Sequence, residues 1–205
     1  MKTNTAIAKD IITKTVSSLE EKGIKPFVVN NRAEALYKIK EMIPSGASVM
    51  NGSSRTLEQI GFVQLLKSAS HSWNNLHETV LNEMDPIKQR SLRKQSVLSD
   101  YYVGSVHALT EKGEFVIGSN TGSQLPHIVF TSPNLIFVVG EQKIVKTLED
   151  ALERLENYVV PLEDKNMKTK YGVGTQLNKI VIFRGENPGL GRVVNVIIVK
   201  EELGF

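Results

Sequence analysis

The first regular pattern along the chain is a helical one. Apolar residues recur at spacings of three and four from Ala6 to Leu19, and Gly23 follows as a stop signal. This pattern predicts an amphipathic helix over residues 5–22. Its apolar stripe is expected to pack on the rest of the protein.

Two short apolar runs, residues 27–29 and 47–50, flank a second helical pattern and predict buried strands. Asn31 precedes that helix and Glu34 lies three residues further on, which is the arrangement of an N-terminal capping box. A strand, a helix and a strand at this spacing predict a parallel pair with a right-handed crossover.

The middle of the chain is predicted to be mostly helical. Residues 63–84 show an apolar face that includes Trp73. Asp85 is a suitable N-cap and Pro86 suits the first helical position, so a further helix is predicted to about Ser99.

A hairpin follows these helices. Residues 101–109 predict a strand, and residues 114–117 predict a second strand that pairs back onto it. Glu111-Lys112-Gly113 between them predicts a tight turn, with the glycine where a positive φ is expected.

The C-terminal half alternates strands with one more helix. Residues 135–140 form a continuous apolar run, which is typical of a strand at the centre of a covered sheet. An apolar stripe over residues 144–159 predicts a helix that Pro161 limits. Residues 179–183 and 193–199 predict two last strands, joined by turn-forming residues.

Composition agrees with one globular α/β domain over residues 1–205, since no repeat or linker divides the chain. Hydrophobic residues make up 40% and charged residues 23%, which argues against disorder. The net charge of +3 is small and no nucleic-acid-binding motif accompanies it, so nucleic acid is not an expected partner.

The residues also exclude several kinds of chemistry. The chain has no cysteine, which rules out disulfides, thiolate nucleophiles and cysteine-held zinc or iron–sulfur clusters. The four histidines show no HxH or HExxH spacing, so no metal site is predicted. Lys9 and Asp10 interrupt the N-terminal apolar residues, and no apolar run approaches the roughly 20 residues of a membrane span. We therefore expect a cytoplasmic protein that does not enter a membrane.

A first candidate binding segment is the loop 51–58, which joins a predicted strand to a short helix. Its small and polar residues offer hydroxyls and backbone N–H groups to a phosphate or a carboxylate, and its arginine offers a counter-charge. The candidate ligand-binding residues here are Asn51, Gly52, Ser53, Ser54 and Arg55. The alternative is an ordinary strand-to-helix turn with capping serines. The loop is not a P-loop, because the GxxxxGK[ST] pattern is absent.

A second candidate binding segment is the loop 118–124, which follows the hairpin. Its glycines permit a close backbone approach, and its other residues supply donors and acceptors. The candidate ligand-binding residues here are Gly118, Asn120, Thr121, Gly122, Ser123 and Gln124. The alternative is that these small residues only allow the chain to bend.

Glu111 is the candidate catalytic residue. It is the acidic residue of the hairpin turn and would act as a general base or a covalent nucleophile if a cleft buried it. The alternative is a solvated turn residue. His127 near the end of the second loop is a further acid–base candidate, His107 could face a cleft, and His77 is expected at the edge of the core.

Four segments together resemble the LUD domain family, the lactate-utilisation proteins of the LutC/YkgG type. They are NGSSRTLEQIG over residues 51–61, ALTEKGEF over 108–115 with the loop over 118–124, LIFVVG over 135–140 with Ile144-Val145, and VIIVKEELGF over 196–205. Each segment is modest by itself, but their order and spacing are fairly specific.

The resemblance implies a Rossmann-like three-layer α/β/α fold with a mostly parallel sheet, like that of the NagB/RpiA/CoA-transferase superfamily. It also implies a role in oxidising lactate, in company with iron–sulfur partner proteins. Many members carry a cysteine cluster near the end of the chain, whereas residues 172–179 read GVGTQLNK here. A direct electron-transfer role for this chain is therefore in doubt.

These observations lead to one expected function and two alternatives. The expected function is to bind a small anionic metabolite between the 51–58 and 118–124 loops, in lactate or related organic-acid metabolism. One alternative is a superfamily enzyme, a transferase or an isomerase, that uses Glu111. The other is a non-catalytic subunit of an oxidation complex. The sequence names no cofactor and leaves a homodimer open.

Overall fold

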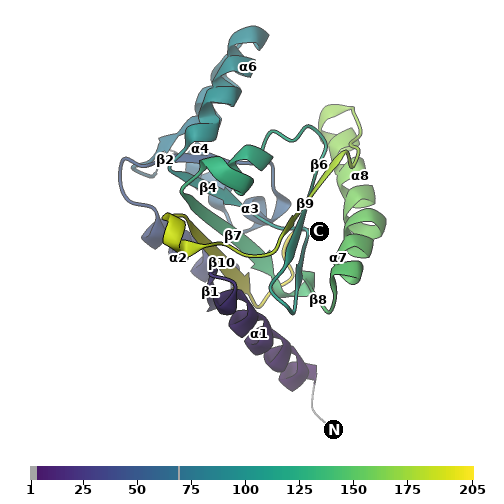
Figure 1. Ribbon diagram of the computed structural model, residues 1–205. Coiled ribbons are helices and arrows are strands. Elements are labelled where there is room, and N and C mark those ends of the chain that lie inside the picture. Colours follow the sequence, from purple (N-terminus) through teal and green to yellow (C-terminus); the bar gives the residue numbers. More distant parts are fainter. Residues whose placement is uncertain (1–3, 69) are drawn as a thin grey trace.

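A six-stranded parallel sheet forms the centre of the protein, as the computed structural model shows for residues 4–68 and 70–205 (Figure 1). Its strand order is β1-β10-β7-β4-β2-β3, and every neighbouring pair is parallel. The strands are β1 (Lys25–Val29), β2 (Ser48–Asn51), β3 (Asn74–Asn75), β4 (Tyr101–Gly104), β7 (Asn134–Gly140) and β10 (Val193–Val199). All their carboxyl ends therefore lie at one edge of the sheet.

A smaller four-stranded sheet stands beside the first, in the order β8-β5-β6-β9. Its strands are β5 (Ala108–Thr110), β6 (Phe115–Ser119), β8 (Ile144–Val145) and β9 (Lys179–Phe183). The hairpin β5–β6 turns at Gly113, whose φ is 78°, and β9 adds antiparallel to β6. The two predicted C-terminal strands are thus confirmed, but they belong to different sheets.

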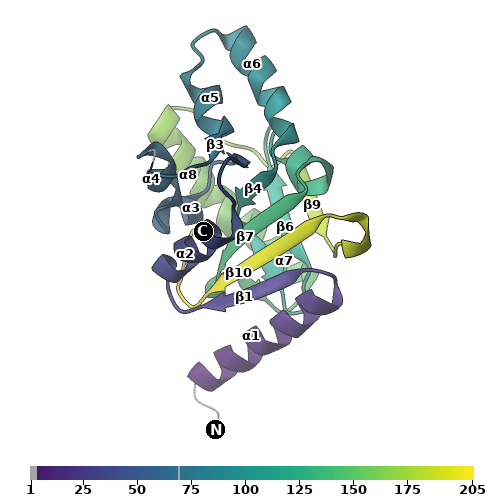
Figure 2. The ribbon, with the colours of Figure 1, turned by 90° about the vertical axis from the view of Figure 1, so that its left-hand side faces the viewer.

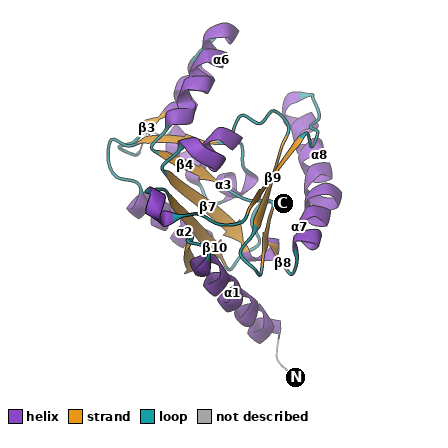
Figure 3. Cartoon of the chain, in the orientation of Figure 1, coloured by secondary structure: helices purple, strands orange, loops and turns teal. Residues whose placement is uncertain are grey.

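The helices are distributed on both sides of these sheets (Figures 2 and 3). They are α1 (Asn4–Glu21), α2 (Arg32–Met42), α3 (Arg55–Gln59), α4 (Phe62–Lys67), α5 (Leu76–Asn82), α6 (Pro86–Gln95), α7 (Leu148–Arg154) and α8 (Val160–Tyr171). Short 3-10 or π segments are η1 (Ser96–Leu98), η2 (His127–Thr131), η3 (Glu141–Lys143), η4 (Leu155–Val159) and η5 (Pro188–Leu190). The predicted cap at Asn31 is confirmed, since its side chain accepts a hydrogen bond from the backbone N–H of Glu34.

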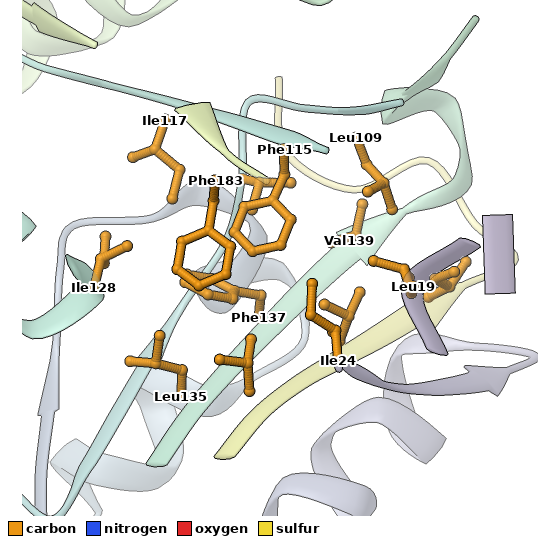
Figure 4. Packing of buried hydrophobic residues seen from close by; sticks show 14 of the residues in the cluster. Leu19, Ile24, Leu109, Phe115, Ile117, Ile128, Leu135, Phe137, Val139 and Phe183 are labelled. Atoms are coloured by element: carbon orange, nitrogen blue, oxygen red, sulfur yellow. The ribbon is translucent and has the colours of Figure 1, made fainter. Parts of the chain in front are cut away.

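Alternating strand residues send side chains to two separate cores on the two faces of the central sheet. On one face, Ile136 and Ile197 pack against α2, α3 and α4. On the other face, Phe137 packs against Phe115 and Phe183 of the smaller sheet (Figure 4). Helix α7 covers the outer face of the smaller sheet. The predicted fold class is confirmed as a three-layer α/β fold with a mostly parallel central sheet.

Helix α1 runs beside β1 and reaches the tip of the β5–β6 hairpin. A Cβ atom on Gly113 would lie 3.0 Å from the backbone of Ser18, so the hairpin turn needs a glycine for packing as well as for its φ. The first predicted helix is confirmed within one residue at each end.

The prediction that residues 63–84 are mostly helical holds only for α4 and α5. The chain forms α4, then β3, then α5. The Trp73 indole donates a hydrogen bond to the carbonyl oxygen of Ile43, 3.1 Å away, and Asn75 caps α5 through the backbone N–H of Glu78. These contacts hold the segment against β2 and interrupt the helical pattern.

The predicted strand over residues 101–109 is in fact two strands in two sheets. Strand β4 pairs with β2 and β7, whereas β5 pairs with β6 and β8. Between them the Ser105 hydroxyl donates to the carbonyl oxygen of Val138, 2.7 Å away, where the chain leaves the central sheet. Sequence periodicity does not register this change of sheet, because both halves are buried.

The helix predicted over residues 144–159 is wrong at both ends. Ile144 and Val145 pair with β5 as strand β8, and the helix begins after the capping residue Thr147. Pro161 does not end the helix, because it lies in the first turn of α8, directly after the π segment η4. The helical run therefore passes through Pro161 and continues to Tyr171.

Candidate functional site

The candidate site lies where the connections of the central sheet diverge. The chain leaving β2 continues outward to β3, whereas the chain leaving its neighbour β4 returns inward to β7. Such a switch point opens a crevice at the carboxyl ends of the strands, which is where open α/β sheets bind ligands. A cavity of about 390 Å³ occupies this position.

The two predicted loops meet at this cavity. Of the predicted ligand-binding residues, Gly122 is the one that does not line it. The predicted residues that line the cavity are Asn51, Gly52, Ser53, Ser54, Arg55, Gly118, Asn120, Thr121, Ser123 and Gln124. A Cβ atom on Gly52 would lie 3.7 Å from Oε1 of Gln124, so the loops are in close proximity. Gly122 instead shapes the second loop, with a φ of 83° and its N–H donated to the Ser119 hydroxyl.

Asn51 presents an unpaired acceptor in the first loop. Its side chain is 2% exposed, and its Nδ2 donates to the carbonyl oxygen of Gly52, 3.1 Å away. Its Oδ1 has no hydrogen-bond partner among the described residues. Because an unmade hydrogen bond on a buried polar atom is costly, this oxygen is suited to accept a hydrogen bond from a ligand.

Arg55 is less available than its charge suggests. Its Nη1 lies 3.0 Å from Oε2 of Glu58, and Nζ of Lys170 lies 2.8 Å from Oε1 of the same carboxylate. The two cations hold the pKa of Glu58 below its usual value in spite of partial burial. Ser54 caps α3 through the N–H of Leu57, so part of this loop has the structural role of an ordinary turn.

Lys143 is the buried cation of the site, and the sequence prediction missed it. It follows β7 in the segment η3, lines the cavity and is 3% exposed. Its ammonium donates to Oγ1 of Thr56 at 3.0 Å, to Oγ of Ser105 at 3.1 Å and to the carbonyl oxygen of Val106 at 3.1 Å. No carboxylate contacts it in the part of the chain that the structure describes.

The surroundings of Lys143 are those of a charged ammonium without a counter-ion. Both hydroxyls send their own protons elsewhere, Thr56 to the carbonyl oxygen of Leu203 and Ser105 to that of Val138, so both act as acceptors toward Nζ. Burial lowers the pKa of Lys143 to about 7, and the nearby charge of Arg154 adds to the shift. The position of this lysine after a buried strand, at the same sheet edge as the first loop, is the signal that could have identified it.

Arg154 is a second cation with unmet hydrogen-bonding capacity. Its guanidinium lies over the ring of Tyr158, 4.8 Å from the centroid, and burial lowers its pKa. Its Nε and Nη2 are buried and have no hydrogen-bond partner within the described residues. The arginine does not line the cavity, but its charge acts on both Lys143 and His107.

The His107 ring faces the cavity as a neutral donor. Its Nδ1 accepts a hydrogen bond from the backbone N–H of Gly118 at 3.0 Å, which places the proton of the neutral ring on Nε2. Burial lowers the pKa of His107 to about 3, and the charges of Lys143 and Arg154 add to that shift. The ring therefore stays uncharged throughout the physiological pH range.

His127 and Tyr102 form a buried aromatic pair on another wall of the cavity. Their rings stack with centroids 4.9 Å apart. Nδ1 of His127 lies 3.2 Å from the Ser99 hydroxyl and 3.0 Å from the Ser132 hydroxyl, and burial lowers its pKa to about 4. Burial also raises the pKa of Tyr102, so both rings are neutral.

Glu111 lies outside this cavity. Its carboxylate contacts Nζ of Lys14 on α1 at 2.6 Å, at the turn of the β5–β6 hairpin. The cavity end of the same hairpin supplies His107 and Gly118. The structure gives Glu111 a contact that ties α1 to the hairpin and does not bring it to the two loops.

His77 also lines the cavity, at its α5 wall, and is not only a residue at the edge of the core. Burial lowers its pKa, and the charges of Arg93 and Lys67 contribute. Among the described residues, no group of three or more His, Cys, Asp or Glu side chains is placed to hold a metal ion. Nor does any helix of the described segments have the length and apolar character to cross a membrane.

The fold and this crevice define a Rossmann-like α/β protein with a ligand-sized cavity at its topological switch point. Comparison with known proteins then gives the family. The LUD domain matches residues 12–181, and the chain belongs to the LUD domain family. A search among curated proteins finds no significant match.

One similar solved structure supports the same fold. It is the crystal structure of a DUF162 family protein from Deinococcus radiodurans, with a TM-score of 0.56 and 12% sequence identity. The similarity covers 94% of this chain and 98% of that one, so it extends over the whole architecture.

Proposed function

We propose that this protein binds a small anionic metabolite in the cavity between the 51–58 and 118–124 loops, and that it serves lactate or related organic-acid utilisation. The observation that carries the proposal is the buried ammonium of Lys143, which lines the cavity and whose hydrogen-bond acceptors among the described residues are all neutral. Membership of the LUD domain family supports the metabolic context.

The energetic argument rests on the cost of a buried charge. An isolated buried ammonium is expensive, and neutral hydrogen-bond acceptors compensate for it only in part. An anion that enters the cavity replaces a neutral acceptor of Lys143 and neutralises its charge in a medium of low dielectric constant. Arg154 strengthens the attraction, because its charge acts on the same region and no carboxylate of the described residues pairs with it.

Neutral polar groups that line the cavity with Lys143 can form hydrogen bonds with the uncharged polar groups of an organic acid. His107 lines the cavity with its ring proton on Nε2, and Ser53, Thr121 and Ser123 also line it. Oδ1 of Asn51 offers an acceptor to a ligand hydroxyl. Such a set suits a carboxylate with a neighbouring hydroxyl or carbonyl group.

The test is ligand binding by calorimetry and thermal shift. The probes are lactate, pyruvate, sugar phosphates, nucleotides and CoA, each with the full-length protein. We expect at least one carboxylate or phosphate to raise the melting temperature, and Lys143→Met to reduce that shift. Lys146→Met removes an exposed lysine three residues away and serves as the matched control. If no anion bound to the wild-type protein, the proposal would be wrong.

A subunit role is a second candidate, because the α5–α6 hairpin exposes apolar side chains. Met84 is 89% exposed and Ile87 is 81% exposed. Iron–sulfur partner proteins of lactate oxidation would supply the electron carriers that a chain without cysteine does not hold. Co-purification with such proteins, lost in a Met84→Ser/Ile87→Ser variant that still folds, would support it. Purification as a monomer without partners would count against both this role and a homodimer.

A further inference from the structure

The cavity has an apolar wall as well as a cationic one. Val80 and Leu81 come from α5, Val159 from η4 and Met167 from α8, and all four line the cavity. Leu81 is 54% exposed although it is a large apolar side chain beside a ligand-sized space. A purely polar ligand would leave this wall in contact with water, whereas apolar ligand atoms would cover it.

The volume also exceeds the needs of a three-carbon acid. A space of about 390 Å³ corresponds to roughly a dozen water molecules at about 30 Å³ each. Lactate and pyruvate have six non-hydrogen atoms, so they would leave most of that space to water. Pockets of roughly 300–1,000 Å³ enclose much larger organic ligands.

The cationic and the apolar lining residues come from different elements of the fold. Lys143 lies in η3 just after the carboxyl end of β7, and His107 lies just before the amino end of the β5–β6 hairpin. The apolar side chains belong to α5, η4 and α8. A ligand that contacts both sets of residues therefore carries one charged group and an apolar body.

We propose that the ligand is an amphipathic monocarboxylate whose apolar body is longer than three carbons, with its carboxylate at Lys143 and His107 and its body against Val80, Leu81 and Met167. This inference rests on the proposed function and narrows its ligand class. It makes lactate and pyruvate weak ligands of the cavity rather than optimal ones.

A series of straight-chain carboxylates tests the apolar wall. Calorimetry with propionate, butanoate, hexanoate and octanoate should show affinity rising about fourfold per added methylene group while the chain stays within the cavity. The matched primary amides should bind at least tenfold more weakly, because they bring no charge to Lys143. Both comparisons use the wild-type protein and so do not depend on a variant that folds.

Two pairs of variants test whether the apolar residues cause the dependence on chain length and whether Lys143 causes the preference for acid over amide. Leu81→Asn should flatten the dependence on chain length and keep the preference for acid over amide. Its control, Leu190→Asn, changes an exposed leucine that does not line the cavity. Lys143→Met should remove the preference for acid over amide, whereas Lys146→Met should not.

The outcomes separate this inference from the proposed function. Binding of carboxylates with equal affinity at every chain length would overturn the amphipathic ligand and leave an anion site in place. Unchanged chain-length dependence in Leu81→Asn would overturn the placement of the apolar body. Absence of binding by any carboxylate, phosphate or nucleotide would overturn both proposals.

Discussion

The backbone N–H of Gly118 donates a hydrogen bond to Nδ1 of His107, 3.0 Å away, and this contact joins the two strands of a hairpin at the edge of the cavity. The two nitrogens of the His107 ring thus have different roles. Its Nδ1 accepts a hydrogen bond from a backbone donor, and its Nε2 carries the proton that the ring can offer to a ligand in the cavity that it lines.

Substitutions of His107 can separate these two roles. The Oδ1 atom of an asparagine can replace Nδ1, so His107→Asn should keep the bond to Gly118 and lose the donor toward the cavity. We expect stability within about 1 kcal/mol of the wild type and weaker ligand binding. His107→Ala leaves the Gly118 N–H unpaired and should cost about 1–3 kcal/mol. Urea unfolding and calorimetry measure the two effects. Equal loss of stability in both variants would contradict the assignment.

Stability should fall when the solution is acidified. His107 and His127 have pKa values of about 3 and about 4 in the folded protein, below the 6.5 of an unperturbed histidine. The unfolded chain therefore binds more protons, and the free energy of unfolding decreases as the pH falls from about 6.5 toward 4. Each histidine contributes up to about 1.4 kcal/mol per pH unit in that window.

Urea unfolding between pH 4 and 8 checks this slope. His127→Gln should flatten it, because its side chain cannot gain a proton in the unfolded state. If the slope of the wild type were the same in a variant lacking both His107 and His127, other groups would be responsible for it.

Ligand binding should take up protons near neutral pH. Lys143 has a pKa of about 7 in the free protein, and a bound anion favours its ammonium form, so its pKa rises in the complex. Affinity should then be highest below pH 7 and fall by up to tenfold per pH unit above it. Calorimetry in buffers with different ionisation enthalpies measures the proton uptake. Binding enthalpies that did not depend on the buffer would contradict this role of Lys143.

A side chain at Gly52 should destabilise the protein through a clash with the Tyr102 hydroxyl, and a second substitution should remove that clash. A Cβ atom at Gly52 would lie 2.8 Å from the hydroxyl of Tyr102, which is 4% exposed and has little room to move. Gly52→Ala should therefore lower stability by about 1–3 kcal/mol through overpacking. Adding Tyr102→Phe removes the clashing oxygen and should recover part of that loss. A double-mutant cycle by urea unfolding measures the coupling, and additive effects would argue against the clash.

Glu111 should matter little to binding. Its partner Lys14 is 61% exposed, and such surface ion pairs contribute about 0.2–1 kcal/mol. Glu111→Gln should change stability by no more than that and leave ligand affinity unchanged. A large loss of affinity or of any turnover in this variant would restore the catalytic hypothesis for Glu111.

Local signals in the sequence were sufficient for much of the fold. The first helix, the Asn31 cap, the Gly113 turn and strand β10 depend on short-range spacing and capping, and their predictions are confirmed. The two errors with the largest consequences, at residues 63–84 and 101–109, involve segments whose conformation follows from distant partners. Pairing of β3 with β2 and of β5 with β8 overrides the local pattern there.

The candidate site divides in the same way. The small polar residues of both loops could be identified in the sequence, because each loop is a run of glycine and polar residues directly after a predicted strand. Lys143 could not be identified as a site residue in the same way, because a lysine that follows a strand is usually solvated. It is buried here by Thr56, which is 87 residues away, and by Ser105, which is 38 residues away. The sequence by itself thus determined the loops and the fold class, whereas only the tertiary structure decided which cation lies at the cavity, since burial depends on contacts between distant segments.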